Sequence, residues 1–224
     1  MKLGVLFSGG KDSTLAMSKA LVNHEIVCLI SLISKNPESY MFHVPNISLV
    51  DLQADAMELP LIKKETEGVK EEELVQLKEA ILKAKEKYGI EGIATGAVRS
   101  IYQCSRVQKI CHELGLWCFN PLWLKDQMEL LEETKKFNVI ISGVFAYKIG
   151  KEFLGKQIDD TIITKLEKLQ QELGINPAGE GGEIETTVLD APFFRKKIKI
   201  NDFEIDFKDN CGNYIIKKAE LVAK

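Results

Sequence analysis

Residues 8 to 13 combine the side chains and the spacing of a turn that binds phosphate and metal. They read Ser8-Gly9-Gly10-Lys11-Asp12-Ser13 and follow the apolar run of residues 3–7. Two adjacent glycines let the backbone approach an anion closely, and the free N–H groups at the start of a following helix favour negative charge. Lys11 adds a cation. Asp12 would repel phosphates unless a divalent cation lay between them, so we interpret Asp12 as a magnesium ligand.

This hexapeptide lacks the GxxxxGK[ST] spacing of the Walker A loop. It resembles the SGGxDS pyrophosphate loop of the N-type ATP pyrophosphatases, which cleave ATP between its α and β phosphates. The resemblance implies that all six residues, Ser8, Gly9, Gly10, Lys11, Asp12 and Ser13, hold ATP and magnesium, and that Lys11 and Asp12 are catalytic. The alternative is a tight strand-to-helix turn with an Asp N-cap, which requires neither paired glycines with a lysine nor a second serine.

A second unusual stretch, residues 179–187, reads GEGGEIETT. Three glycines interleaved with three glutamates favour neither a strand nor a helix, so this composition predicts a loop whose backbone is shaped for a ligand. A flexible acidic surface loop is the alternative interpretation.

The elements that would position these stretches alternate in type along the first half of the chain. Apolar runs predict strands at 3–7, 26–33, 61–62, 92–96 and 116–119, and helical spacing predicts helices at 14–22, 48–59, 71–88 and 100–114. This order predicts a parallel α/β sheet, in which ligands bind beyond the carboxyl ends of the strands. We therefore expect residues 8–13 and residues 96–106 to face one crevice.

The pattern changes after Trp123. Helices are predicted at 126–137 and 159–173, a strand at 139–145, and period-two alternation in 198–207 predicts strands around a hairpin turn at Asn201-Asp202, before a last strand at 214–222. The predicted fold class is thus α/β, with a Rossmann-like nucleotide domain at residues 1–123. A smaller α+β domain for substrate recognition is predicted at residues 124–224.

Composition narrows the class of protein. The chain has 224 residues, 45% of them hydrophobic, and a net charge of -3, so it offers no basic footprint and nucleic acid is an unlikely partner. No apolar run is long enough to span a membrane and the chain begins with a predicted strand, so we expect a cytoplasmic protein. The five cysteines form no CxxC pair, and buried, inert thiols are the favoured interpretation.

Several stretches together resemble the diphthine–ammonia ligase family, in the order seen there and over nearly the entire chain. They are residues 8–13, 39–43 (SYMFH), Gly96-Ala97-Val98 with Tyr102, Gln103 and Arg106, 121–123 (PLW), and 179–186 followed by Asp190-Ala191-Pro192. The EGGExET segment is specific to this family, whereas many ATP pyrophosphatases share the pyrophosphate loop.

The resemblance implies an adenine nucleotide alpha hydrolase-like nucleotide domain and the last step of diphthamide synthesis. ATP would adenylate the carboxylate of diphthine, a modified histidine of translation elongation factor 2, and ammonium from solution would supply the nitrogen. Gly96 would join the nucleotide site. The implied substrate-side residues are His43, Tyr102, Gln103, Arg106, Glu180, Gly181, Gly182, Glu183, Glu185 and Thr186. A glutamate suits ammonium or the trimethylammonium group of diphthine, and Tyr102 or Trp123 would add a cation–π face.

Three alternatives stay open at this point. A related pyrophosphatase would activate a tRNA base for thiolation, although such enzymes need reactive cysteines and a basic surface. A nucleotide-binding sensor would bind ATP without cleaving it. In the third alternative, Arg106 forms an ion pair, Trp123 is a packing residue, and neither contacts the substrate. An exposed strand edge near residues 198–207 also makes a homodimer possible.

Overall fold

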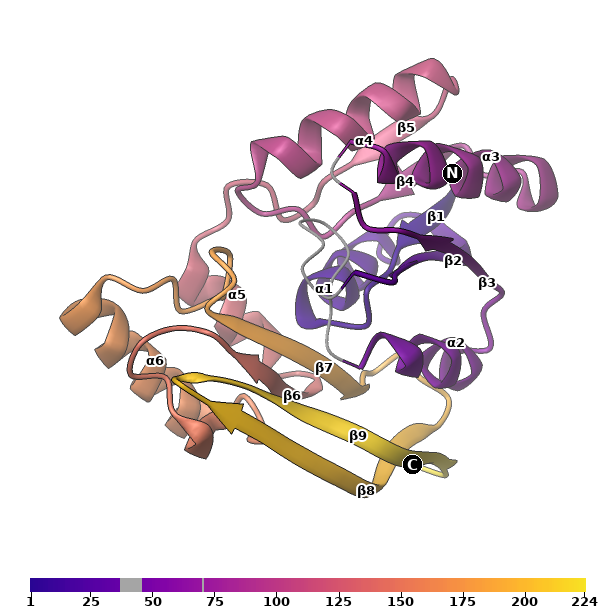
Figure 1. Ribbon diagram of the computed structural model, residues 1–224. Coiled ribbons are helices and arrows are strands. Elements are labelled where there is room, and N and C mark those ends of the chain that lie inside the picture. The colour runs from indigo at the N-terminus through magenta and orange to yellow at the C-terminus, as the bar shows by residue number, and fades with distance from the viewer. Residues whose placement is uncertain (37–45, 70) are drawn as a thin grey trace.

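The computed structural model describes residues 1–36, 46–69 and 71–224, and these residues form two sheets with helices packed against them (Figure 1). The first part of the chain contains β1 (Lys2–Leu6), α1 (Lys11–Ala20), β2 (Glu25–Ser34), η1 (Ile47–Leu49), α2 (Val50–Met57), β3 (Leu61–Thr66), α3 (Glu73–Tyr88), β4 (Gly92–Ala94), α4 (Ile101–Glu113) and β5 (Trp117–Phe119). The second part contains α5 (Gln127–Thr134), β6 (Asn138–Val144), η2 (Lys151–Phe153), α6 (Asp160–Leu173), β7 (Ile184–Asp190), β8 (Lys197–Lys208) and β9 (Cys211–Val222).

The first sheet is parallel throughout, with strand order β3-β2-β1-β4-β5. Its central strands β1, β2 and β4 are mostly apolar on both faces because helices cover both. On one face, Ile30 of β2 packs with Leu77 and Ile81 of α3 and with Ile110 of α4. On the other face, α1 lies against the sheet (Figure 1). The predicted α/β fold class is confirmed, and the crossover order brings the ends of β1 and β4 side by side.

The second sheet is antiparallel, with strand order β7-β6-β9-β8. Helix α6 packs on it through Ile162, Ile163 and Leu166. A single cluster of buried apolar side chains runs from β1 and α1 through α5 to β6 and β7. The two predicted domains are therefore joined by one continuous core, and their boundary at Trp123 remains a prediction. Strand β8 is one of the two edge strands of this sheet, and a homodimer through that edge also remains a prediction.

Two expectations for the second half were wrong. Residues Asn201-Asp202 are not a hairpin turn, because β8 continues to Lys208 and only shifts its register against β9 at these positions. The turn is instead Asp209-Asn210, where both residues have positive φ (51° and 64°), as a two-residue type I′ hairpin requires. The stretch 179–187 is a loop only up to Glu183, since Ile184 begins β7 and pairs with Val144 of β6.

Helix length and composition also bear on membrane insertion. Across the described parts of the chain, none of the helices is both long enough and apolar enough to cross a bilayer.

Candidate functional site

The predicted pyrophosphate loop lies between β1 and α1. Phe7 follows β1, Gly9 has a φ of 78°, and Gly10 is the extended N-cap residue that precedes Lys11. A Cβ atom on Gly9 would collide with the side-chain amide of Gln53 in addition to the strain of positive φ. The backbone therefore requires glycine at this position.

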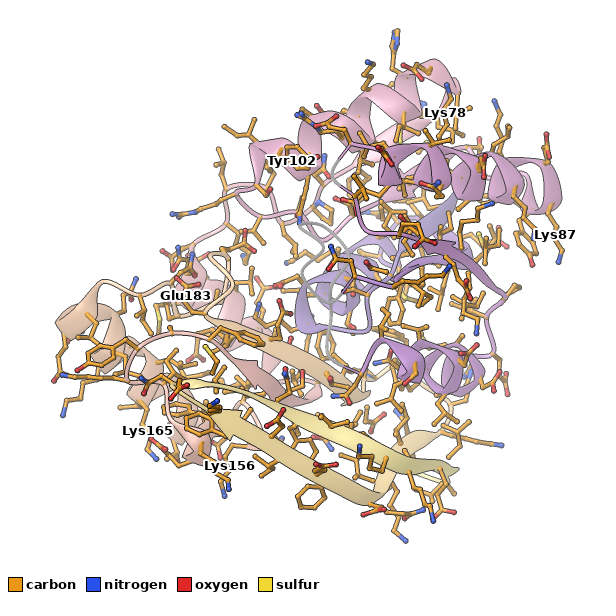
Figure 2. All side chains as sticks on the ribbon, viewed as in Figure 1. Lys78, Lys87, Tyr102, Lys156, Lys165 and Glu183 are labelled. Carbon is orange, nitrogen blue, oxygen red and sulfur yellow. The ribbon has the colours of Figure 1, made fainter. Side chains whose placement is uncertain are left out.

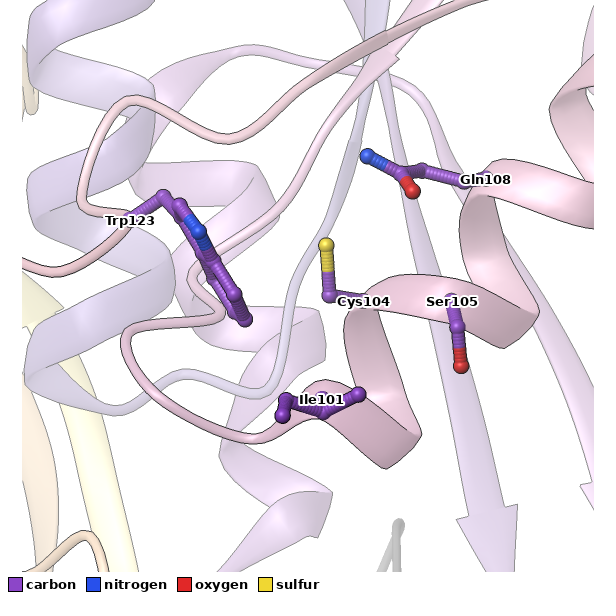
Figure 3. Close-up of a pocket in the computed structure, with 5 residues that line it drawn as sticks. All are labelled: Ile101, Cys104, Ser105, Gln108 and Trp123. Carbon is purple, nitrogen blue, oxygen red and sulfur yellow. The ribbon is translucent and has the colours of Figure 1, made fainter.

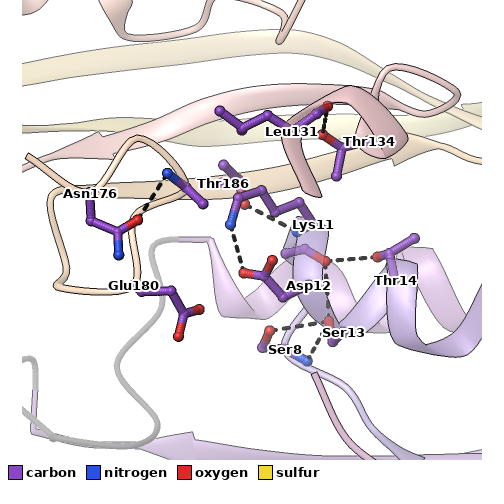
Figure 4. A network of polar contacts seen from close by, with 12 residues as sticks. Ser8, Lys11, Asp12, Ser13, Thr14, Leu131, Thr134, Asn176, Glu180 and Thr186 are labelled. Atoms are coloured by element: carbon purple, nitrogen blue, oxygen red, sulfur yellow. Dashed lines mark hydrogen bonds and ion pairs between the residues drawn. The ribbon is translucent and has the colours of Figure 1, made fainter. Parts of the chain in front are cut away.

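Hydroxyl groups hold this turn in shape (Figure 4). Ser13 Oγ accepts a hydrogen bond from Ser8 N at 3.3 Å and donates to Gly10 O at 3.2 Å. Thr14 Oγ1 donates to the same carbonyl at 2.8 Å. The two serines of the motif thus hold the backbone of the turn in one shape.

Lys11 and Asp12 form a close charge pair at the start of α1. Lys11 is only 3% exposed, and its Nζ lies 2.7 Å from Asp12 Oδ2. The other oxygen, Asp12 Oδ1, is buried and accepts no hydrogen bond from the described residues. An unsatisfied buried carboxylate oxygen fits a hard cation such as Mg²⁺. The described residues contain no group of three or more His, Cys, Asp or Glu side chains that could hold a metal ion by themselves.

Strand β7 of the second sheet forms hydrogen bonds with the predicted pyrophosphate loop. Thr186 Oγ1 accepts a hydrogen bond from Lys11 N at 3.1 Å, and Val188 N donates to Gly9 O at 3.0 Å. A Cβ on Gly10 would stand 3.2 Å from Thr186 O, so the second glycine allows this close approach. The segment that follows the acidic loop is therefore in direct contact with residues 9–11.

Gln53 of α2 forms further hydrogen bonds that join the turn to β7. It is 1% exposed, and its Nε2 donates both to Gly9 O at 2.9 Å and to Val188 O at 2.8 Å. Sequence reasoning missed this residue. The only signal was a glutamine at a position of α2 that shares its buried face with Val50, Ala54 and Met57.

Gly96, in the loop after β4, packs against the first turn of α1. A Cβ on Gly96 would lie 2.7 Å from Ser13 N and 2.8 Å from the Asp12 carbonyl carbon. Only glycine allows the loop after β4 to pack against the first turn of α1. Residues 8–13 and Gly96 are thus adjacent, as the parallel topology predicts.

The acidic loop before β7 contacts the loop that follows β4. Gly179 and Gly182 both have positive φ, and Glu180 Oε2 accepts a hydrogen bond from Arg99 N at 3.1 Å. Glu183 serves the loop itself, because its two oxygens accept from Asn176 N at 3.0 Å and from Gly181 N at 2.9 Å. Glu180 therefore reaches across to the loop after β4, while Glu183 shapes the backbone.

The charges of Lys11 and Asp12 affect the pKa values of Glu180 and Glu185. Burial raises the pKa of Glu185 to about 7; Lys11 lowers it, while Asp12 and Glu180 raise it further. Burial and the nearby Asp12 carboxylate also raise the pKa of Glu180. Asp12, Glu180 and Glu185 thus lie close enough to act on one another's ionisation, with Lys11 as the cation that opposes the effect of the carboxylates.

The remaining predicted substrate residues lie on α4 or outside the described residues. Arg106 Nη2 lies 2.6 Å from Glu71 Oε1, and its guanidinium stacks 3.9 Å from the centre of the Tyr102 ring, which Figure 2 labels. Gln103 N donates to the N-cap hydroxyl of Ser100. His43 falls among residues 37–45, outside the described residues. Substrate contacts by these four residues remain predictions.

Comparisons with known proteins point to one group. The family profile described as diphthamide synthase N-terminal domain matches residues 1–118, and the one described as diphthamide synthase C-terminal domain matches residues 124–222. A diphthine–ammonia ligase of Bos taurus is 35% identical over 92% of this chain and 85% of that protein. One of Homo sapiens is 34% identical over the same shares, and one of Schizosaccharomyces pombe is 33% identical over 100% of this chain and 40% of that protein.

Proposed function

The chain belongs to the diphthamide synthase family, and we infer from this that it is a ligase that amidates diphthine to diphthamide with consumption of ATP. Membership of this family favours amidation over tRNA thiolation and over a sensor without catalysis. The single observation that carries the inference within the fold is the contact between Thr186 and Lys11, because it joins the phosphate-binding turn to the strand that follows the acidic loop.

The first step is the activation of a carboxylate. A carboxylate oxygen of diphthine attacks the α-phosphorus of ATP, and pyrophosphate leaves. Lys11 and the N-terminus of α1 stabilise the negative charge that develops on the phosphate oxygens. Asp12 would hold Mg²⁺ through Oδ1, and the bound ion supplies further neutralisation of phosphate charge.

The second step replaces the adenylate by nitrogen. The lone pair of ammonia attacks the acyl carbon, AMP leaves with the electrons of the acyl–oxygen bond, and the nitrogen loses one proton to water to give the neutral amide. Ammonium has no lone pair, so a proton must first pass to a base. The Glu185 carboxylate suits this task, because its pKa of about 7 lets it both release and accept a proton near neutral pH. Glu180, beside it, would help to hold the ammonium cation.

The partners follow from this chemistry. The protein substrate is elongation factor 2 bearing diphthine, and ammonium in solution is the nitrogen donor. We place the reaction in the cytoplasm because the elongation factor works there.

The test is a reconstituted reaction with diphthine-bearing elongation factor, ATP, Mg²⁺ and ammonium. We expect AMP and pyrophosphate in equal amounts, together with the mass change of a hydroxyl replaced by an amino group on the modified histidine. Asp12→Asn should abolish both products, whereas Asp55→Asn on the exposed side of α2 should not. Formation of ADP, or an unchanged histidine mass, would refute the proposal.

A further inference from the structure

The side chain of Gln53, on α2, holds a carbonyl of the phosphate-binding turn from outside the motif. It is 1% exposed, and its Nε2 donates to Gly9 O at 2.9 Å and to Val188 O at 2.8 Å. Both N–H bonds of the amide nitrogen are therefore used. Two acceptors at one end of the amide also fix its orientation, because the opposite orientation would set the amide oxygen against two carbonyl oxygens.

The other end of the same amide has no partner. Gln53 Oε1 is buried and accepts no hydrogen bond from the described residues. A buried amide oxygen without a donor lowers stability, so its presence calls for an explanation. The hydrogen bonds of Nε2 supply one, because they hold a carbonyl of the turn itself in addition to a carbonyl of β7.

The Gly9 carbonyl sets the direction of the N–H group that follows it. It accepts hydrogen bonds from Gln53 Nε2 and from Val188 N, so it points toward α2 and β7. The described residues contain no cis peptide bond, and in a trans peptide the C=O and N–H bonds point in opposite directions. Gly10 N–H is therefore held pointing away from α2 and β7.

Gly10 N–H is also one of the donors of the turn that the fold does not use. Lys11 N donates to Thr186 Oγ1 and Ser8 N donates to Ser13 Oγ, so neither is free for a ligand (Figure 4). Gly10 is a buried residue, and its N–H finds no acceptor among the described residues. Such an N–H is rare in a folded protein, and a phosphate oxygen is a suitable acceptor for it.

We propose that Gln53 is a positioning residue, which holds the Gly9–Gly10 peptide so that Gly10 N–H donates a hydrogen bond to the pyrophosphate portion of ATP. The proposal rests on the proposed function, which places the phosphates of ATP on residues 8–13. Gln53 acts through the Gly9 carbonyl and does not contact the ligand. Loss of its amide therefore weakens the binding of ligands that carry pyrophosphate and spares AMP, which lacks the two phosphates that reach Gly10 N.

The test compares three ligands by calorimetric titration in the presence of Mg²⁺: ATP, inorganic pyrophosphate and AMP. Gln53→Met keeps the length of the side chain and removes its amide. We expect this variant to bind ATP and pyrophosphate about tenfold more weakly than the wild type, and AMP within about twofold of the wild type. Unchanged affinity for pyrophosphate, or an equal loss of affinity for AMP, would overturn the positioning role.

Two control variants separate positioning from stability. Val50→Ala truncates a fully buried side chain on the same helix, and should lower the urea midpoint without changing the ratio of ATP to AMP affinity. Gln108→Met makes the same substitution at an exposed position of α4, and should bind all three ligands normally. Gln108 lines a pocket of about 200 Å³ there, together with Ile101, Cys104, Ser105 and Trp123 (Figure 3). A loss of pyrophosphate binding in either control would overturn the assignment to the Gln53 amide.

A measurement on the wild type covers the case in which Gln53→Met does not fold. In NMR spectra of ¹⁵N-labelled protein, pyrophosphate with Mg²⁺ should shift the amide proton of Gly10 downfield, as a new hydrogen bond does, while the side-chain amide protons of Gln53 stay protected from exchange. An unshifted Gly10 resonance would overturn the proposal. Failure of the proposed ligase function is distinct, because it would show as protein that binds pyrophosphate in this way and forms no AMP.

Discussion

Replacing Glu185 by glutamine tests the electrostatics of the site most sharply. Glu185 opposes Gly143 across the β6–β7 pair and lies in the field of Lys11, Asp12 and Glu180. Burial disfavours its charged form, and only Lys11 among these three neighbours favours it. Glutamine keeps the size of the side chain and cannot ionise, so the variant isolates the cost of that buried charge.

The magnitude follows from the raised pKa. The pKa of Glu185 is 4.5 in the unfolded chain and about 7 in the folded chain. Between these two pH values the folded state therefore holds a proton that the unfolded state has lost. The unfolding free energy therefore falls as the pH rises from about 4.5 to 7, and levels off above 7. The full loss is at most about 3 kcal/mol, and partial exposure of the side chain reduces it.

The assay is urea unfolding at pH 5 and pH 8, in EDTA and without ATP. We expect the difference in unfolding free energy between Glu185→Gln and the wild type to shift by about 1–3 kcal/mol in favour of the variant from pH 5 to pH 8. Glu86→Gln, on the exposed face of α3, is the matched control and should track the wild type. Equal pH dependence of the Glu185 variant and the wild type would show that Glu185 is not held in the protonated form, and would remove it as the proposed base.

Four further changes probe the rest of the site. Asp12→Asn should reduce AMP formation about 100-fold or more and raise the Mg²⁺ concentration needed for the half-maximal rate; an unchanged Mg²⁺ dependence would argue against Asp12 as a ligand. Thr186→Val leaves Lys11 N without its acceptor and should lower the unfolding free energy by about 1–3 kcal/mol, with exposed Thr161→Val as a silent control in urea titrations. Gly96→Ala should cost about 1–3 kcal/mol of stability and weaken ATP binding, and normal calorimetric affinity would contradict the close packing. Arg106→Ala should leave the urea midpoint nearly unchanged, so a loss of affinity for the diphthine-bearing factor would identify a role in recognition.

The parts of the fold and site that were predictable from sequence are those with local causes. Residues 8–13 signal their own structure, since paired glycines, a strand and a helix start are neighbours in the chain. The parallel sheet followed from apolar runs that alternate with helical spacing, because strands covered on both faces contain few polar residues. The position of Gly96 beside Ser13 followed from topology alone.

Contacts between distant segments were not predictable in the same way. Lys11 and Thr186 are 175 residues apart, and the sequence around neither residue predicts the hydrogen bond between them. Gln53 likewise joins Gly9 to Val188 from an ordinary helix. The acidic stretch looked like loop throughout because its glycines mask the strand that starts at Ile184, where pairing with β6 outweighs weak local propensity.

The misplaced hairpin turn has a related cause. Asn201-Asp202 and Asp209-Asn210 carry similar turn signals, and only pairing with β9 decides between them. The first becomes a local shift of register, and the second becomes the turn.

The most direct measurement of the central claim uses isotopically labelled ammonium. Purified protein, ATP, Mg²⁺ and diphthine-bearing elongation factor 2 are incubated with the label, and the modified histidine is analysed by mass spectrometry. The proposed function predicts labelled nitrogen in the amide of diphthamide, with one AMP released for each amide formed. Release of AMP without labelled amide, or labelled amide without AMP, would contradict it.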